Sequence, residues 1–207
     1  VAVTVLSPLS PADEICRARD FAAEAGIDHV ELELDEMAIP GFADNGSDRC
    51  YLCRKARQER VRRWTGERGF SLLLDGMNVS DRDDYRPGMR AADEDGVRHP
   101  LIEAGFAKAE VRELSRRLGL SGWDRPAQSC LATRFPPGFG LTRERLERVA
   151  EAETFLKERG AEELRVRHFP CRTAVIAAPR PEEIVARREE IVAALKQAGF
   201  AFVAVDL

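Results

Sequence analysis

The stretch Val1-Ala2-Val3-Thr4-Val5-Leu6 decides the fold, because it reads as a buried strand at the head of an alternating series of strands and helices. Proline, serine and acidic residues at positions 8–14 mark a helix start, and Gly26 marks its end. The next run, His29 to Leu34, alternates apolar with charged residues, which is typical of a half-buried strand. The series predicts an α/β fold.

The alternation continues along the first two thirds of the chain. We expect a strongly basic helix from Cys53 to Gly66, and the apolar run Phe70-Ser71-Leu72-Leu73-Leu74 predicts a short strand in a central parallel sheet. Further helices are expected over residues 89–96 and 108–118. Strands that alternate with helices indicate α/β layers joined by right-handed crossovers.

A proline- and glycine-rich run, Pro136-Pro137-Gly138-Phe139-Gly140, predicts a domain boundary. After it, Thr142 caps a helix that runs to about Gly160. Strands are expected over residues 164–168 and 173–178, a helix over 181–199 and a last strand over 200–207. This order predicts a small α+β domain at 141–207 beside a larger α/β domain at 1–136.

Composition excludes several classes of protein. The 207 residues are 44% hydrophobic and 33% charged, an ordinary globular balance. A net charge of -4 argues against a broadly basic nucleic-acid binder, and no apolar run has membrane-spanning length. Five cysteines without a secretion signal favour metal or catalytic roles over disulfides. We therefore expect a cytoplasmic protein that does not bind a membrane.

Three cysteines carry the strongest chemical signal. Cys50 and Cys53 form a CxxC pair, and Cys130 lies far downstream with Arg134 four residues after it. Three thiolates suit an iron–sulfur cluster with one iron left open, or an unusual zinc site. The alternatives are a structural zinc clip, two unrelated thiols at the CxxC pair, and an ordinary buried cysteine at position 130.

Two loops that follow predicted strands are candidate ligand sites, because ligands bind at the carboxyl ends of parallel strands. The first contains Ser7, and the second reads Asp75-Gly76-Met77-Asn78-Val79-Ser80-Asp81. Gly76 permits a close backbone approach, Asn78 offers a donor and an acceptor, and Asp81 can hold Mg²⁺ beside phosphates. The alternative is a turn of solvated polar residues.

Arg165 and Arg167 alternate along a predicted strand and so point to the same face. Two such arginines form a natural clamp for a phosphate or a carboxylate. A surface sheet face balanced by acids is an equally good interpretation. His29 and His99 have no partner pattern nearby, and we predict no special role for them.

These segments together resemble the LarE-type sulfur transferases of the PP-loop ATP pyrophosphatase superfamily, over nearly the whole chain. The matching segments are Arg49-Cys50-Tyr51-Leu52-Cys53-Arg54, Asp75-Gly76-Met77-Asn78, Asp84-Tyr85-Arg86-Pro87-Gly88-Met89-Arg90-Ala91, Pro100-Leu101, Trp123-Asp124-Arg125-Pro126-Ala127, Cys130-Leu131-Ala132-Thr133-Arg134 and Arg165-Val166-Arg167-His168. The resemblance implies a Rossmann-like PP-loop (adenine nucleotide alpha hydrolase-like) sheet with a small α+β C-terminal domain for substrate binding and oligomerisation.

The resemblance also implies an activity. The family uses ATP and Mg²⁺ to adenylate a carboxylate of a pyridinium nucleotide and then inserts sulfur, which gives a thiocarboxylate of the nickel-pincer nucleotide. In one variant a cysteine matching Cys130 sacrifices its own sulfur. In the other, cysteines matching Cys50, Cys53 and Cys130 hold a [4Fe-4S] cluster that passes on sulfide from a donor. Three cysteines are present here, so we expect the cluster-bearing variant, with Cys130 and Arg134 catalytic and Arg165 and Arg167 on the substrate phosphate.

The chain departs from the family pattern in places. The family's phosphate-binding SGGxDS loop would precede Val1, so we expect the printed sequence to begin at the family's second strand, with residues missing at both ends. His99 stands where the family often has Ser, and Ala174 where a Glu is common. The resemblance further implies a homo-oligomer.

Two other functions remain open on the sequence. Cluster-bearing relatives in the superfamily thiolate tRNA; the acidic net charge argues against tRNA here, but the basic helix after Cys53 argues for it. A non-catalytic PP-loop-like protein with structural zinc would need a fourth ligand besides the three cysteines.

Overall fold

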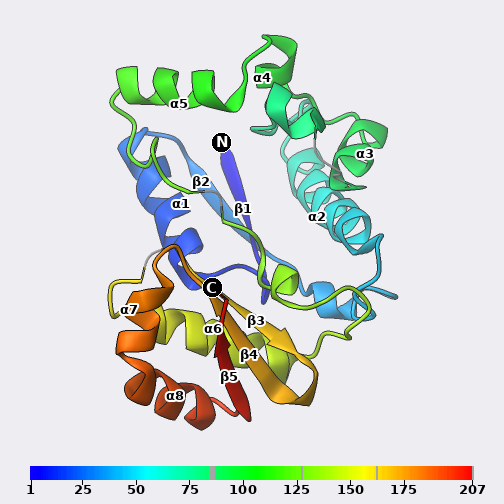
Figure 1. Cartoon of the computed structure of the whole chain (residues 1–207). Helices are drawn as coiled ribbons and strands as arrows, with labels where there is room; N and C mark the ends of the chain where they lie inside the picture. The colour runs from blue at the N-terminus through cyan, green and yellow to red at the C-terminus, as the bar shows by residue number, and fades with distance from the viewer. Residues whose placement is uncertain (84–86, 127, 162, 207) are drawn as a thin grey trace. The chain divides into compact units, whose positions relative to one another are not determined.

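The computed structural model describes residues 1–83, 87–126, 128–161 and 163–206. Within the quoted motifs, Asp84, Tyr85, Arg86 and Ala127 lie outside the described residues, as does Leu207 at the end of the expected last strand. The chain forms two compact units (Figure 1). Unit 1 comprises Val1–Ser7, Ala12–Ile39 and Ser47–Ala127, and unit 2 comprises Pro8–Pro11, Pro40–Gly46 and Gln128–Leu207.

The beginning of unit 1 is a strand–helix–strand element, as the sequence predicts. Strand β1 (Ala2–Leu6) and strand β2 (His29–Glu33) are parallel, with Val3 opposite Val30. Helix α1 (Ala12–Glu24) connects them (Figure 1) and buries Ala22 beside the sheet. The α/β class is therefore confirmed.

The strand expected at Phe70–Leu74 is wrong. The described segment makes only an isolated parallel bridge, between Leu74 and Arg98. Its apolar side chains are largely exposed, with Phe70 at 46%, Leu72 at 62% and Leu74 at 55% of their full accessible surface. A strand requires a hydrogen-bonded neighbour along its length, and an apolar sequence alone does not supply one.

Four helices complete unit 1: α2 (Arg49–Gly66), α3 (Pro87–Glu94), α4 (Pro100–Glu103) and α5 (Lys108–Arg117). Helix α2 begins four residues earlier than the sequence indicated, so that it includes Cys50. Helix α3 packs on α2 through Ala91 and Ala92, whose small side chains are fully buried. No helix in the described part of the chain combines the length and the apolar character needed to cross a bilayer.

Unit 2 is a three-stranded sheet with helices. Its elements are α6 (Arg143–Lys157), β3 (Arg165–Phe169), β4 (Thr173–Ala177), α7 (Pro181–Ala186), α8 (Arg188–Gln197) and β5 (Phe202–Val205). Strand β4 lies in the middle, antiparallel to β3 and parallel to β5. Thr142 caps α6 as predicted, because its hydroxyl accepts a hydrogen bond from the Arg145 N–H at 3.2 Å. The single helix expected over 181–199 is instead two helices that meet at Arg187.

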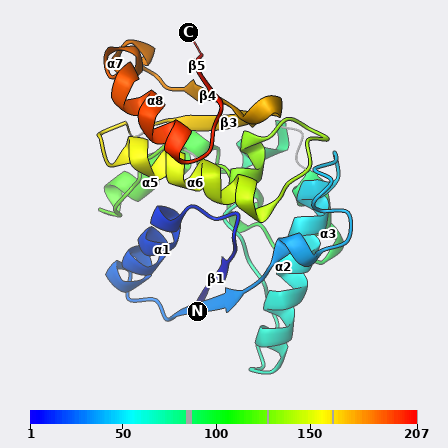
Figure 2. The ribbon, with the colours of Figure 1, turned by 90° about the horizontal axis from the view of Figure 1, so that it is seen from below.

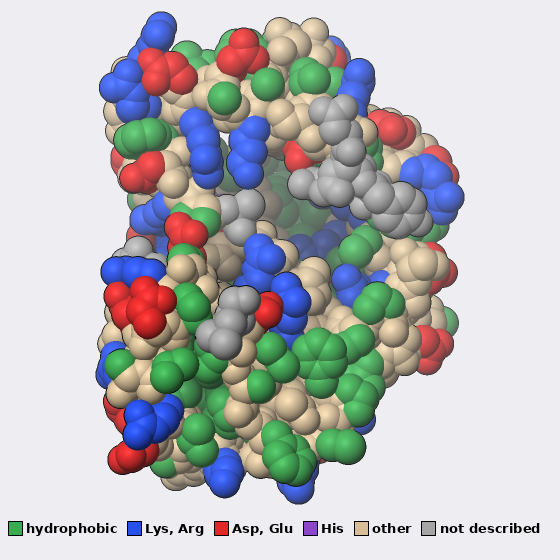
Figure 3. All heavy atoms as spheres, viewed as in Figure 1, with side chains coloured by type: hydrophobic (Ala, Val, Ile, Leu, Met, Phe, Trp, Pro, Cys, Tyr) green, Lys and Arg blue, Asp and Glu red, His purple; other side chains and the backbone are tan. Residues whose placement is uncertain are grey.

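The two faces of this sheet differ. One face buries Val166, His168 and Ile176, and helices α6 and α8 lie on it (Figure 2). The opposite face carries Arg165 and Arg167 together with Phe202, which is 61% exposed. Hydrophobic side chains gather over the lower part of the molecule in Figure 3, where Figure 1 places β3 to β5. The sheet is therefore half-covered, as the alternation along β3 predicts.

Two short segments from the first half of the chain belong to the core of unit 2. Leu9 is buried, and its carbonyl accepts a hydrogen bond from the Leu131 N–H at 2.9 Å. Asn45 is buried too, and its amide donates to the carbonyls of Pro136 at 2.8 Å and Phe139 at 3.2 Å. The proline- and glycine-rich run thus lies inside unit 2, and its conformation is fixed by Asn45.

His168 occupies an aromatic cluster in the core of unit 2. Its ring is 1% exposed and lies 5.5 Å from Phe135, 5.7 Å from Phe139 and 5.1 Å from Phe200, measured between ring centroids. The Nε2 atom accepts from Arg148 at 3.2 Å, and Nδ1 donates to the Phe169 carbonyl at 3.1 Å. Burial, and then the charge of Arg148, lower the pKa of His168, so the ring is neutral in the folded protein.

The stability of unit 2 is expected to fall in mild acid. Because the pKa of His168 is lowered by folding, the unfolded chain takes up a proton at a higher pH than the folded one. The melting temperature, measured between about pH 7.5 and pH 5, should decrease as the pH falls through the range below the ordinary histidine pKa. His168→Phe should make this dependence shallower, whereas His29→Gln in unit 1 should leave it unchanged. An equally steep dependence in His168→Phe would contradict the assignment.

Candidate functional site

The cysteine pair lies at the start of helix α2. Cys50 and Cys53 are three residues apart in its first turns and therefore face the same side of the helix. Cys50 is exposed and Cys53 is partly exposed, and neither belongs to a disulfide among the described residues. Arg49 Nη2 lies 3.6 Å from Cys50 Sγ. The helix N-terminus and this guanidinium place positive charge beside Cys50.

A buried carboxylate lies directly behind Cys53. Glu36 is 0% exposed, and its carboxylate accepts hydrogen bonds from the Ser7 hydroxyl at 2.6 Å and from Arg57 Nε at 2.9 Å. Cys53 Sγ lies 3.9 Å from the same carboxylate. Burial lowers the pKa of Arg57, but the negative charges of Cys53 and Glu36 outweigh this effect and raise it above its ordinary value. Glu36 therefore joins the end of β1 to the cysteine helix.

Glu36 was missed in the sequence analysis, because a single Glu in an acidic loop reads as a solvated side chain. The signal that was available is its neighbour Asp35, which caps the short 3₁₀ helix Glu36–Ala38 by accepting from the Met37 N–H at 3.1 Å. Only the tertiary fold shows that Glu36 points into unit 1.

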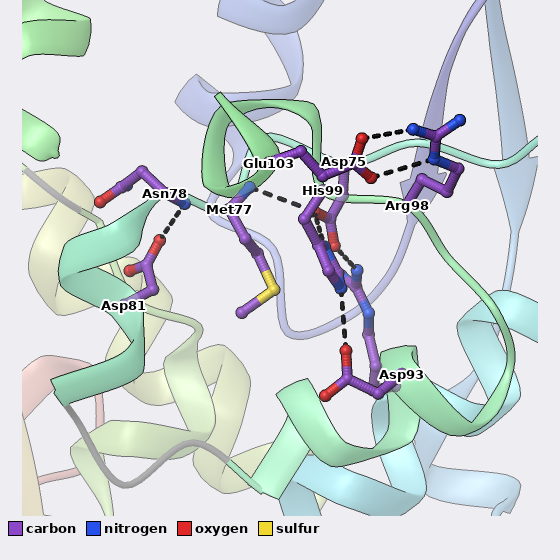
Figure 4. A network of polar contacts seen from close by, with 9 residues as sticks. Asp75, Met77, Asn78, Asp81, Asp93, Arg98, His99 and Glu103 are labelled. Atoms are coloured by element: carbon purple, nitrogen blue, oxygen red, sulfur yellow. Dashed lines mark hydrogen bonds and ion pairs between the residues drawn. The ribbon is translucent and has the colours of Figure 1, made fainter. Parts of the chain in front are cut away.

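The loop Asp75–Asp81 is folded by its own polar side chains (Figure 4). Asp75 accepts a hydrogen bond from the Met77 N–H at 3.1 Å, and Asp81 accepts one from the Asn78 N–H at 2.9 Å. Asn78 in turn accepts from the Ser80 N–H at 3.1 Å. Beside Gly76 there is open space where a side chain would stand. The loop is thus preformed, and its glycine leaves room for a ligand to approach the backbone.

His99, for which the sequence shows no partner pattern nearby, lies in a network with the head of this loop. Its Nδ1 lies 2.7 Å from Asp75 Oδ1, and its Nε2 lies 3.2 Å from Asp93 Oδ1 (Figure 4). The other oxygen of Asp75 forms an ion pair with Arg54, which follows Cys53 on α2. No local sequence pattern indicated this network, because its members come from four separate segments.

Cys130 and Arg134 lie in unit 2, at the 3₁₀ turn Leu131–Arg134. Arg134 is 1% exposed, and its guanidinium donates to Glu153 at 2.6 and 3.2 Å. It also donates to the hydroxyls of Ser129 at 2.7 Å and Thr133 at 2.9 Å, and Thr133 donates to the Cys130 carbonyl at 2.7 Å. The observed contacts of Arg134 therefore hold the turn that carries Cys130. Its predicted catalytic role stays a prediction.

Glu153 completes this arrangement. Its carboxylate, 3% exposed, also accepts the Val166 N–H at 2.9 Å and so links the Cys130 turn to the start of β3. The side chains of Arg165 and Arg167 project from the opposite face of that strand, and both are exposed. The structure brings these two arginines together on one face, as the spacing predicts. Their binding of a phosphate remains a prediction.

The predicted site residues thus fall into two groups. Unit 1 holds Ser7, Cys50, Cys53, Gly76, Asn78 and Asp81, and unit 2 holds Cys130, Arg134, Arg165 and Arg167. Within unit 1, Glu36 connects Ser7 with Cys53. Among the residues that the structure describes, no three His, Cys, Asp or Glu side chains form a ready metal site.

Several known proteins are similar to the chain in sequence. No family model matches the chain. An uncharacterized protein of Synechocystis is 39% identical over the whole chain and 78% of its own length. The pyridinium-3,5-bisthiocarboxylic acid mononucleotide synthase of Lactiplantibacillus plantarum is 32% identical over the whole chain and 75% of its own length. An uncharacterized protein of Methanocaldococcus jannaschii is 28% identical over 85% of the chain and 69% of its own length.

The fold and the site define an α/β protein of two units, with a thiol-bearing helix in the first and a half-covered, arginine-bearing sheet in the second. Together with the similarity over the full chain, this places it in a particular family. The chain belongs to the LarE family, that of the pyridinium-3,5-bisthiocarboxylic acid mononucleotide synthases.

The buried ion pair of Arg134 and Glu153, next to the turn that carries Cys130, is expected to be essential for the stability of unit 2. Glu153→Gln leaves the guanidinium of Arg134 buried without a counter-charge, which should lower the free energy of unfolding by about 3–5 kcal/mol. Urea denaturation followed by circular dichroism measures this loss. Glu151→Gln, an exposed position on the same helix, should change the free energy by less than about 0.5 kcal/mol. Equal effects of the two substitutions would contradict the prediction.

Proposed function

We propose that the protein is an ATP-dependent sulfur transferase that converts a carboxylate of a pyridinium nucleotide into a thiocarboxylate, in nickel-pincer nucleotide biosynthesis. The observation that carries this proposal is the 32% identity, over the whole chain, to a synthase whose name describes a bisthiocarboxylic acid mononucleotide. The finer features, namely ATP, Mg²⁺ and the cluster, rest on the resemblance and on the chemistry of the side chains.

The proposed reaction has two steps. First, a carboxylate oxygen of the substrate attacks the α-phosphorus of ATP, and pyrophosphate leaves. Second, a sulfur nucleophile attacks the activated carbonyl carbon, and AMP leaves with the electron pair of the broken C–O bond. The first step brings a carboxylate to the phosphates of ATP, and the second brings a sulfur nucleophile to an acyl group that carries AMP. Because like charges meet in both steps, the site must supply compensating positive charge and hydrogen-bond donors.

In unit 1, the Asp75–Asp81 loop and Ser7 are the proposed nucleotide-binding residues. Gly76 leaves space for the nucleotide beside the backbone, and Asn78 and Asp81 hold the shape of the loop. Asp81 is the proposed Mg²⁺ ligand beside the phosphates, because carboxylate oxygens are what this cation prefers. The Ser7 hydroxyl is oriented by its hydrogen bond to Glu36.

The donor set of the chain fits an iron–sulfur cluster in chemical terms. Cys50 and Cys53 are accessible cysteines outside any disulfide of the described residues, on one side of a helix N-terminus, where positive charge favours an anionic group. Cys130 is a third free thiol in unit 2. When bound by these three thiolates, a [4Fe-4S] cluster supplies an open iron for an added sulfide, which is the sulfur nucleophile. Arg134 fixes the turn that carries Cys130, and a sulfide donor is the proposed partner.

In unit 2, Arg165 and Arg167 are the proposed ligands of the substrate phosphate. Both guanidiniums lie exposed on the uncovered face of the sheet. This face also carries Phe202 and is the proposed contact between copies of the chain in a homo-oligomer.

The charges on α2 argue against tRNA as the substrate. Three of its seven basic side chains pair with acids from other segments, Arg54 with Asp75, Lys55 with Glu94 and Asp95, and Arg57 with Glu36. Cations that are already paired in this way offer less charge to a phosphate backbone. We therefore propose no second function.

Metal analysis tests the cluster directly. Protein purified without oxygen should contain iron and acid-labile sulfide in matching amounts and a visible absorption band. Cys50→Ser, Cys53→Ser and Cys130→Ser should each lose most of both, whereas Cys16→Ser and Cys171→Ser should keep them, because these two exposed thiols are not part of the proposed set. Zinc in place of iron, or no metal, would contradict the cluster. Conversion of Cys130 to dehydroalanine during turnover, seen as loss of H₂S in the intact mass, would show that it sacrifices its own sulfur.

The arginine pair is tested by steady-state kinetics. Arg165→Ala or Arg167→Ala should raise the KM for the nucleotide substrate about tenfold or more, because each removes a charge-assisted hydrogen bond to the phosphate. Arg180→Ala, at an exposed arginine elsewhere in unit 2, should leave KM unchanged. Unchanged KM in both of the first two variants would remove the clamp assignment.

A further inference from the structure

Asp75 attaches the Asp75–Asp81 loop to the rest of unit 1. Its side chain is 16% exposed, and one of its oxygens accepts the Met77 N–H at 3.1 Å and contacts His99 Nδ1 at 2.7 Å (Figure 4). The other oxygen forms an ion pair with Arg54 of α2. The first turn of the loop is therefore held by side chains from outside the loop.

The guanidinium of Arg54 is itself held in place. Its Nε donates to the side-chain oxygen of Gln58, one turn further along α2, at 3.1 Å, in the amide orientation that satisfies both polar ends of Gln58. Gln58 is 3% exposed, and in this orientation its nitrogen donates to the Asp95 carboxylate at 2.6 Å and to the Ala91 carbonyl at 3.2 Å. Because a guanidinium is planar and rigid, fixing Nε also fixes the direction of the donors that face Asp75.

The pair of Arg54 and Asp75 differs from another ion pair on the same helix. The side chains of Arg54 and Asp75 are 33% and 16% exposed, whereas those of Arg63 and Glu59 are 70% and 76% exposed and lie 3.7 Å apart. Water screens an exposed pair and leaves it little effect on structure. Of these two pairs, the one at Arg54 is therefore able to set the position of a segment.

Arg54 also belongs to the turn of α2 that carries the cysteines. It directly follows Cys53 and lies four residues after Cys50. Helix α3 packs against this turn, because a Cβ added at Gly88 would lie 3.7 Å from the Arg54 Cβ and 3.5 Å from the Cys50 carbonyl oxygen. One side chain thus joins the cysteine turn to the loop.

We propose that Arg54 is a positioning residue, which holds Asp75 and thereby keeps the Asp75–Asp81 loop in its nucleotide-binding conformation. The inference deepens the proposed function, because it rests on this loop as the nucleotide site. It adds a coupling: a nucleotide that binds only this conformation of the loop also stabilises the contact with Arg54, and so orders the turn that carries Cys53. Order in that turn favours nucleotide binding by the same factor.

Amide hydrogen exchange of the intact protein, purified without oxygen, tests the positioning role without nucleotide. The Met77 N–H reports on Asp75, to which it donates, whereas the Ser80 N–H donates to Asn78 within the loop. In Arg54→Gln, protection of Met77 should fall about tenfold, in line with the loss of a hydrogen bond between charged groups, and protection of Ser80 should change less. Arg63→Gln, which breaks the exposed pair on the same helix, should behave as the unchanged protein.

Arg54→Lys provides a milder second variant. It keeps a positive charge for Asp75, but a lysine has no second nitrogen for Gln58 and is not rigid. Protection of Met77 should therefore lie between that of the unchanged protein and that of Arg54→Gln. Unchanged protection in both Arg54 variants, or an equal loss in Arg63→Gln, would overturn the positioning role.

A non-hydrolysable ATP analogue then tests the coupling. In the unchanged protein and in Arg63→Gln, saturation with the analogue should raise the amide protection of residues 53–57 about fivefold or more, and in Arg54→Gln it should not. Calorimetry should show about tenfold weaker binding of the analogue to Arg54→Gln than to Arg63→Gln.

These outcomes separate the inference from the proposed function. Equal affinity in the two variants, together with an equal rise in protection of residues 53–57, would overturn the coupling. Absence of nucleotide binding in the unchanged protein would refute the proposed nucleotide site and the coupling with it. The exchange of Met77 without nucleotide would still decide whether Arg54 holds the loop.

Discussion

A carboxylate removed from water must be paired, and Glu36 is the paired carboxylate on which the arrangement of unit 1 depends. It receives hydrogen bonds from Ser7 at the end of β1 and from Arg57 on α2, and it contacts Cys53. A purely apolar contact would allow the helix to slide or rotate by small amounts. Three polar contacts to one buried group fix the position of the cysteine helix against the strand.

In unit 2, a paired buried carboxylate likewise fixes the position of the turn that carries Cys130. The buried pair of Arg134 and Glu153 connects the turn at Cys130 with the strand that carries Arg165 and Arg167. Buried ion pairs are costly to assemble and add little net stability. Their value here is geometric, because guanidinium and carboxylate meet in few orientations and so define where the thiol and the strand lie.

The basic side chains of helix α2 have a different role in the structure from the one that the sequence suggests. Read alone, its arginines and lysine resemble a surface for nucleic acid. In the fold Arg54, Lys55 and Arg57 pair with acids from separate segments, including Asp75, which also contacts His99. The pair of Arg54 and Asp75 thus links the thiol-bearing helix to the loop proposed to bind the nucleotide.

The sequence by itself determined the α/β class, the strand–helix–strand element at residues 2–33, the cap at Thr142 and the common face of Arg165 and Arg167. Periodicity and capping are local properties, so a short window of sequence is enough to specify them.

The tertiary structure alone decided that the apolar run at 70–74 does not form a strand, that Arg134 is buried, and that Glu36 contacts Cys53 and His99 contacts Asp75. Each of these depends on partners from distant parts of the chain. Strand pairing and the burial of charge are properties of the neighbours that folding brings, and no local pattern encodes them.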